Sequence, residues 1–154
     1  MMFGITEPTG SHLPLLEQAA RNATGLVVEH GAGLYSTPLL ARLGCKVLCC
    51  EPNAGWREWA SWIYDGRGEL VESLRSVIPR LADASLVFID GPANERGELL
   101  NACLSAAVPC IVAHDTHPRC WAENGWTGQH FTPAGYTVTH DEFKRKYRTT
   151  LWQR

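Results

Sequence analysis

Short apolar runs alternate along the chain with segments whose apolar residues recur every three or four positions, and this alternation restricts the fold most. The runs at 86–89 and 110–113 are apolar throughout, as expected for strands covered on both faces of a sheet. Strands separated by helices form parallel sheets with right-handed crossovers. The expected strands are 26–29, 46–50, 63–64, 86–89 and 110–113, and the expected helices are 11–23, 36–43, 56–62, 69–81 and 95–107.

The last part of the chain has a different pattern. Residues 135–139 and 148–152 alternate apolar and polar residues, and a charged segment with Lys144, Arg145 and Lys146 separates them. This pattern is typical of an antiparallel pair joined by a solvated turn. We therefore expect residues 1–154 to form one α/β domain, a three-layer sandwich whose mostly parallel sheet ends in a C-terminal antiparallel strand pair.

The composition argues against several classes of function. A net charge of -2 gives no general attraction to nucleic acid or to an anionic membrane. No apolar stretch reaches the ~18 residues needed to span a bilayer, and the first residues do not resemble a secretory signal. The six cysteines lack a CxxC pair and any metal-type spacing with histidine, which favours reduced, buried thiols in a cytoplasmic protein.

A glycine-containing turn between the first strand and the next helix is the sharpest local motif. Its members are Glu29, His30, Gly31, Ala32, Gly33, Leu34, Tyr35 and Ser36. Glycines let the backbone turn tightly and approach a ligand, and the next helix begins with N–H groups directed at the same place. Glu51, at the tip of the second strand, can accept hydrogen bonds from both hydroxyls of a ribose.

This turn departs from the dinucleotide-binding pattern GxGxxG. Ser36 occupies the position where that pattern has its third glycine. Glu29 places a negative charge where a pyrophosphate would lie, and it suits a positively charged ligand group such as an amine or a sulfonium. A tight strand–helix turn without a ligand is the alternative interpretation.

These motifs resemble those of class I S-adenosylmethionine-dependent methyltransferases, which have a Rossmann-like fold. The resemblance rests on residues 27–33, 47–51 and 86–92 and on the final antiparallel pair. It implies that S-adenosylmethionine is the cofactor, with its methionine end at Glu29 and its ribose at Glu51. Asp65, after the expected third strand, is the candidate near the adenine. The expected cofactor-binding residues are Glu29, Gly31, Ala32, Gly33, Tyr35, Ser36, Glu51, Asp65 and Asp90.

Acidic and histidine residues follow the fourth and fifth expected strands. Asp90 ends the first of these strands, and His114, Asp115 and His117 follow the second, where parallel strands bring side chains to one crevice. In one interpretation, one of these four catalytic candidates takes a proton from a substrate hydroxyl during methyl transfer. In the other, which we favour less, Asp90, Asp115 and His117 hold a divalent metal that orients the substrate. Metal-dependent relatives have Asn where this chain has Thr116.

The acceptor is indicated only by a short similarity. Asp90, Arg96, His114, Asp115 and Arg119 are arranged in the sequence as in small methyltransferase domains that act on sugar hydroxyls, including plant enzymes that methylate glucuronic acid on xylan. This favours O-methylation of a hydroxylated small molecule or glycan. The alternative is a non-catalytic nucleoside-binding, assembly or regulatory protein of the same fold. Loop 120–132 or a second copy of the chain is expected to complete acceptor recognition.

Tryptophan is frequent, with six residues in the chain. Trp56, Trp59 and Trp62 recur every three residues, so we expect them on one helical face packed against the sheet. An aromatic wall beside the adenine is the alternative. Trp121 and Trp126 flank a polar loop and are candidates for a lid, a sugar-stacking surface or a partner interface.

Overall fold

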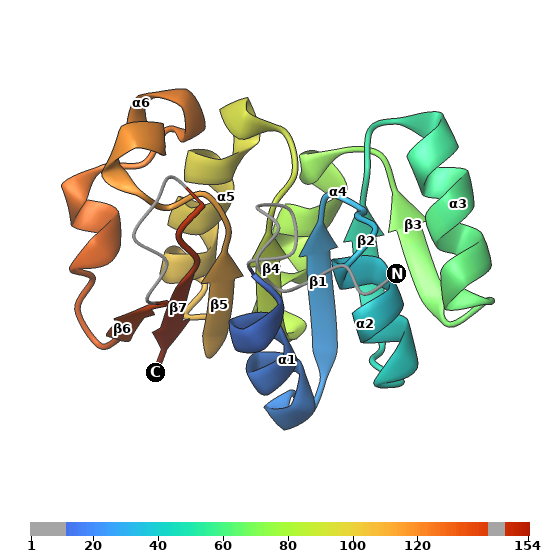
Figure 1. Ribbon diagram of the computed structural model, residues 1–154. Coiled ribbons are helices and arrows are strands. Elements are labelled where there is room, and N and C mark those ends of the chain that lie inside the picture. Colours follow the sequence, from blue (N-terminus) through green and yellow to red (C-terminus); the bar gives the residue numbers. More distant parts are fainter. Residues whose placement is uncertain (1–11, 142–146) are drawn as a thin grey trace.

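The computed structural model describes residues 12–141 and 147–154, and a seven-stranded sheet runs through the centre of this part of the chain (Figure 1). The strand order is β3-β2-β1-β4-β5-β7-β6. Strands β1 to β5 are parallel, and β7 is antiparallel to both of its neighbours. The strands are β1 (Leu26–His30), β2 (Val47–Cys50), β3 (Gly68–Val71), β4 (Ala84–Ile89), β5 (Cys110–Ala113), β6 (Thr137–His140) and β7 (Thr150–Gln153).

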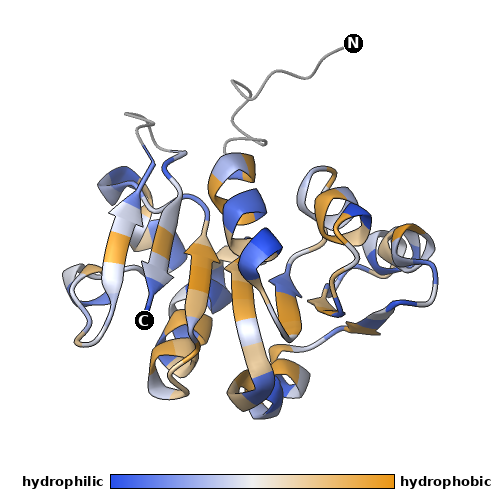
Figure 2. Ribbon diagram, turned by 90° about the horizontal axis from the view of Figure 1, so that it is seen from below, coloured by the Kyte–Doolittle hydropathy of each residue, from blue (hydrophilic) through white to orange (hydrophobic). Residues whose placement is uncertain are grey.

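Helices cover both faces of the sheet, which confirms the expected three-layer α/β sandwich. Helices α1 to α3 pack on one face and α4 to α6 on the other, and each face has its own apolar core. The central strands are largely apolar while the helices carry many hydrophilic residues (Figure 2). The helices are α1 (Leu13–Asn22), α2 (Ser36–Arg42), α3 (Ala54–Tyr64), α4 (Leu74–Val77), η2 (Ile78–Asp83), α5 (Ala93–Ser105), η3 (Pro118–Cys120), α6 (Trp121–Asn124) and η4 (Gly128–Phe131).

The third strand lies later in the chain than expected. Residues 63–64 complete α3 instead of forming a strand, and the helix expected over 69–81 begins only after β3, where the Ser73 side chain accepts a hydrogen bond from the Arg75 N–H. Leu70 packs in the core on one face of the sheet, whereas Leu74 and Val77 pack on the other. The helix expected from periodicity therefore combined apolar residues of two elements, a strand and the separate helix that follows it.

The tryptophans of α3 correct a second expectation. Trp59 is half-buried against the core, but Trp56 is 40% exposed and Trp62 is 76% exposed. A three-residue step falls about 60° short of a full helical turn, so two steps drift by about 120°. The buried face of α3 is formed instead by Ala60 and Tyr64.

Further expectations concern the cysteines, membrane spans and two segments near the chain ends. All six cysteines have free thiols; four of them are buried as expected, whereas Cys45 and Cys110 are half-buried. None of the helices in residues 12–141 and 147–154 has the length and apolar character that a membrane span requires. Ser11, the first residue of the first expected helix, and the basic residues 144–146 lie outside the described residues.

Candidate functional site

The sheet topology defines where a ligand site is expected. Strand order reverses at β1, which lies between β2 and β4, and ligands of open α/β sheets bind at the carboxyl ends of strands beside such a point. In Figure 1 this is the edge toward which the arrowheads of β1 and β5 point. The loops at 31–36, 51–53, 90–92 and 114–117 all follow strands at this edge.

The first glycine of the loop after β1 serves the packing of two strand ends. Gly31 has a φ of +90°, and a Cβ there would lie 2.6 Å from Gly91 Cα and 2.7 Å from the carbonyl oxygen of Asp90. A Cβ on Gly91 would in turn lie 2.5 Å from the buried ring of His30. These glycines allow the backbones after β1 and β4 to approach each other closely.

Glu51 ties the glycine loop to the start of α3. Its Oε1 accepts a hydrogen bond from Ala32 N at 3.2 Å, and its Oε2 accepts one from Asn53 N at 2.8 Å. The residue is 8% exposed at the carboxyl end of β2. An ionised carboxylate has about four acceptor positions, so each oxygen held by an amide can accept a further hydroxyl.

The loop amides are largely engaged with the protein itself, contrary to the expectation that they point at a ligand. Ala32 N donates to Glu51, and Gly33 N donates to Thr37 Oγ1 at 3.1 Å. Tyr35, which directly precedes α2, is half-buried. This loop offers little to a pyrophosphate, which agrees with the departure from the dinucleotide pattern.

Glu29 lies beneath the loop and not on its outer side, which corrects its expected contact with a ligand. Its side chain is fully buried, and Oε1 accepts hydrogen bonds from Thr37 Oγ1 at 2.7 Å and Cys49 Sγ at 3.3 Å. Oε2 accepts one from the Tyr64 hydroxyl at 2.8 Å. Ser36, another expected ligand contact, is buried beside the same carboxyl group. Glu29 therefore holds the loop through Thr37, whose hydroxyl accepts from the Gly33 N–H.

Burial sets the protonation of this acid. Transfer of a carboxylate from water into the core disfavours the charged form, and it raises the pKa of Glu29 from 4.5 to about 7 although hydrogen bonds from Thr37, Tyr64 and Cys49 oppose the rise. Near neutral pH the group is thus poised between its neutral and charged forms.

Asp65 lies at the wrong edge of the sheet for an adenine contact. It ends α3 in the left-handed conformation, with a φ of 48°, three residues before β3 begins. It therefore lies near the amino ends of the parallel strands, opposite the glycine loop. The residues that follow β3 at the correct edge are Glu72 and Ser73, which become identifiable once the strand is placed at Gly68–Val71.

Asp90, His114 and Asp115 meet as the neighbouring strands predict. His114 Nδ1 lies 3.2 Å from Asp90 Oδ1 and 3.6 Å from Asp115 Oδ1. Arg96, from α5, lies between the acids: Nη2 is 3.4 Å from Asp90 Oδ1 and Nη1 is 3.2 Å from Asp115 Oδ2. Arg96 is 8% exposed and was not among the expected catalytic residues, although Asp-Gly-Pro followed by Arg is visible in the sequence.

The charges in this cluster favour an ion pair. Burial disfavours ionisation of Asp90, but the hydrogen bond and charge of His114 outweigh it and lower the pKa of the acid. Burial likewise opposes protonation of His114, but Asp90 raises the pKa of the imidazole above its ordinary value. An imidazole that gains a proton here is stabilised by the carboxylate beside it.

His117 does not join the cluster. Its Nδ1 accepts a hydrogen bond from Arg119 N at 3.2 Å and caps η3. Thr116 is buried, and its hydroxyl lies 2.6 Å from that of Thr150 in β7. The structure therefore does not form the metal set of Asp90, Asp115 and His117.

The tryptophans after β5 anchor their loop to the protein and do not form a lid. The indole N–H of Trp121 donates to Thr116 O at 2.9 Å, and that of Trp126 donates to Asp115 O at 3.0 Å. Trp126 is buried in the core, and Trp121 stacks on Phe131 with ring centroids 5.1 Å apart. Their function in this structure is to fix the backbone that carries Asp115.

His12 is a site residue that sequence reasoning missed. It directly precedes α1, whose N-terminus lies at the carboxyl edge of the sheet because the helix runs back toward the start of β1. Its ring centroid is 4.9 Å from that of Phe88 and 5.1 Å from that of His114. The side chain is buried, and burial lowers its pKa to about 4. Neither ring nitrogen has a hydrogen-bond partner within the described part of the chain.

We expect His12→Phe to stabilise the protein. Phenylalanine fills a similar volume against Phe88 and removes two buried nitrogen atoms that lack hydrogen bonds. An unsatisfied buried polar group costs about 1–3 kcal/mol, so the free energy of unfolding at pH 7 should rise by about 1 kcal/mol or more. Urea denaturation of both proteins measures the difference, and a less stable variant would contradict the expectation.

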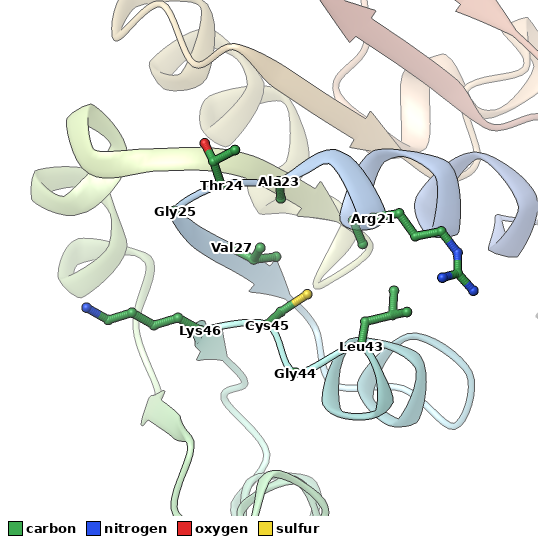
Figure 3. Close-up of a pocket in the computed structure, with 10 residues that line it drawn as sticks. Arg21, Ala23, Thr24, Gly25, Val27, Leu43, Gly44, Cys45 and Lys46 are labelled. Atoms are coloured by element: carbon green, nitrogen blue, oxygen red, sulfur yellow. The ribbon is translucent and has the colours of Figure 1, made fainter.

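A hollow of about 480 Å³ lies at the other end of the sheet (Figure 3). The residues that line it include Arg21, Gly25, Gly44, Cys45 and Lys46, and these precede β1 or β2 or end the helices before them. None of the expected site residues lines it. The hollow is therefore separate from the candidate site.

Comparison with solved structures shows which proteins share this arrangement. Cofactor-bound Rv0187 from MTB is 20% identical, with a TM-score of 0.69 over 99% of this chain and 82% of that one. The O-methyltransferase TomG from Streptomyces achromogenes, in complex with SAM, is 20% identical, with a TM-score of 0.67 over 90% of this chain and 77% of that one. An O-methyltransferase from Bacillus cereus, in complex with SAH, is 15% identical, with a TM-score of 0.67 over 97% of this chain and 82% of that one.

Comparison at the level of sequence identifies no relative. No family model matches it, and no curated protein sequence matches it either. At identities of 15–20%, the three similarities establish the fold, and this is the fold that the sequence motifs imply.

Proposed function

We propose that this chain, which has the Rossmann-like fold of class I O-methyltransferases, is an S-adenosylmethionine-dependent methyltransferase that methylates a hydroxyl group of a small molecule or glycan. The geometry of Glu51 is the observation that carries the proposal. Two backbone amides hold its carboxylate at the carboxyl end of β2, next to β1, where the strand order reverses. Proteins with this fold include O-methyltransferases in complex with SAM or SAH.

The residues around the switch point fit an adenosyl ligand. Glu51 supplies fixed acceptors for the hydroxyls of a ribose, while the engaged amides at Ala32 and Gly33 disfavour a pyrophosphate. S-adenosylmethionine supplies an electrophilic methyl group when bound. The buried Glu29 acts indirectly here, as a positioning residue that holds the loop from below.

The cluster after β4 and β5 supplies the base. His114, whose Nδ1 lies 3.2 Å from Asp90 Oδ1, is the imidazole placed to accept a proton from an acceptor hydroxyl. Asp90 stabilises the imidazolium that forms, and Arg96 fixes both Asp90 and Asp115. Alignment of the hydroxyl oxygen with the methyl group provides the rest of the catalysis.

Calorimetric titration tests the cofactor. We expect the native protein to bind S-adenosylmethionine and S-adenosylhomocysteine with micromolar affinity and to show no binding of NAD. Glu51→Ala removes two hydrogen bonds to a charged group that contribute about 1.5–3 kcal/mol each, so the affinity should fall at least about 100-fold. Glu58→Ala, at an exposed position in α3, serves as the matched control and should bind as the native protein does.

The outcomes separate the two functional classes. Binding that depends on Glu51 supports the methyltransferase and justifies assays of methyl transfer to catechols and sugars. A folded protein that binds neither adenosyl ligand would exclude this proposal and favour the non-catalytic alternative. Circular dichroism of each variant verifies that the fold is retained.

A further inference from the structure

Three side chains on separate elements converge at the carboxyl edge of the sheet. His12 precedes α1, Asp90 follows β4 and His114 follows β5. Each offers one metal-ligating atom, and these atoms all lie within 4.8 Å of one another. His114 Nδ1 and Asp90 Oδ1 lie 3.2 Å apart.

We propose that His12, Asp90 and His114 form a binding site for a transition-metal ion such as Zn²⁺. The set differs from Asp90, Asp115 and His117, which the sequence offered and the structure does not assemble. It also favours a different class of ion. Two imidazoles and one carboxylate suit zinc, iron(II) or cobalt, whereas magnesium and calcium prefer oxygen ligands.

His12 provides the observation that points to a ligand. Its side chain is only 2% exposed, and both ring nitrogens lack a hydrogen-bond partner in residues 12–141 and 147–154. Buried imidazoles ordinarily satisfy at least one nitrogen, because an unpaired polar atom in the core is unfavourable. A metal ion between His12, Asp90 and His114 would give one of the two His12 nitrogens a partner.

The spacing of the three groups is compatible with such an ion. Zinc binds nitrogen and oxygen at about 2.0–2.2 Å, which places ligand atoms about 3–3.6 Å apart around it. The pair His114–Asp90 already has this separation, and the ligand atom of His12, within 4.8 Å of both, has to move closer to complete the site.

The charge around the site also accommodates a cation. Asp90 and Asp115 carry two negative charges near Arg96, which contributes one positive charge to both ion pairs. Arg96 Nη2 lies 3.4 Å from the same Asp90 oxygen that faces His114, so it is the group that a bound ion must displace from that oxygen. After that displacement the guanidinium of Arg96 would keep its ion pair with Asp115.

The position of the site indicates its use. It lies where the fold places the acceptor, and a metal there can orient a hydroxyl group and lower its pKa. With the ion bound, His114 is a ligand and the metal replaces it in activating the hydroxyl. This catalytic use rests on the proposed function, but the metal site itself does not.

Metal binding to the full-length chain, without any adenosyl ligand, tests the site. We expect one equivalent of Zn²⁺ to bind in competition with a chromogenic chelator, and Mg²⁺ to bind far more weakly. His12→Phe keeps the ring packing but removes the nitrogen ligand, so it should weaken Zn²⁺ binding at least about 100-fold. His117→Phe is the matched control, because His117 lies near the cluster without joining it, and it should bind as the native protein does.

Cobalt identifies the ligands, which matters because the chain has six free thiols. Co²⁺ should give visible d–d absorption bands without a thiolate-to-cobalt charge-transfer band, and His12→Phe should abolish these bands. Asp90→Asn should weaken them. Absence of binding to the native protein, equal binding by His12→Phe, or a thiolate charge-transfer band would each overturn the site. Because no adenosyl ligand is present, these results are independent of those for the cofactor.

Discussion

Gly31→Ala is expected to lower the free energy of unfolding by about 3 kcal/mol or more. The new Cβ would lie 2.6 Å from Gly91 Cα, 2.7 Å from Asp90 O and 2.8 Å from Gly91 N. All three atoms belong to the backbone after β4, so no side chain can rotate to make room. The φ of +90° adds strain for any residue with a side chain.

Gly44→Ala separates the steric overlap of the new Cβ from the strain of a positive φ. Gly44 also has a positive φ, of +71°, but a Cβ there would meet nothing within 4 Å. It should therefore show the conformational strain alone, at about 1–2 kcal/mol. Urea denaturation of both variants gives the comparison, and equal losses of stability would show that the backbones after β1 and β4 are not as close as the structure indicates.

The order of the elements was predictable because strand sequences in a covered parallel sheet are distinctive. The run at 86–89 forms the last four residues of β4, and the run at 110–113 is β5 without change. The third strand was not predictable in the same way. Gly68–Val71 contains one buried-face leucine, Leu70, which falls in step with the helical residues that follow it. Short edge strands carry too few residues for their period to be recognised.

The site was predictable where it depends on strand ends. Asp90 and His114 come together because β4 and β5 are neighbours and residues that follow parallel strands share an edge. Arg96 lies in α5 and His12 directly before α1, and the sequence does not specify which strand end a residue of a covering helix reaches. A histidine before the first helix gave no motif, and its place beside His114 depends on how α1 packs across β4 and β5.

The direction in which Glu29 points was also not predictable. Residues at the end of a strand alternate between the two faces of the sheet, and a loop that follows can leave an acid exposed or cover it. Here Tyr64, from the end of α3, supplies a hydroxyl that makes burial of the carboxyl group feasible. That partner lies 35 positions away in the sequence.

Stability should decrease with rising pH because of Glu29, and Glu29→Gln should remove this decrease. The pKa of the carboxyl group is about 7 in the folded protein and about 4.5 when exposed. Below pH 4.5 the group is neutral in both states and has no effect. Between these values only the unfolded chain ionises, so the free energy of unfolding falls, and above pH 7 the loss stays constant at about 3 kcal/mol.

The difference between the two proteins isolates this effect from other titrations. Burial lowers the pKa values of His12 and His30, and these groups make stability rise with pH as they lose their protons in the unfolded chain. Both are present in the native protein and in Glu29→Gln, so their contribution cancels. Measured by urea denaturation, the variant should match the native protein at pH 4.5 and exceed its stability by about 3 kcal/mol at pH 8.

Glu98→Gln is the matched control, because Glu98 lies exposed on α5 and its replacement should leave the pH dependence unchanged. If Glu29→Gln gave a constant difference at all pH values, the acid would have the same pKa in the folded and unfolded chain. Thr37, Cys49 and Tyr64 would then hold the ionised form as well as water does. A growing difference instead means that burial makes ionisation of Glu29 unfavourable, so that the acid beneath the glycine loop stabilises the folded chain in its neutral form.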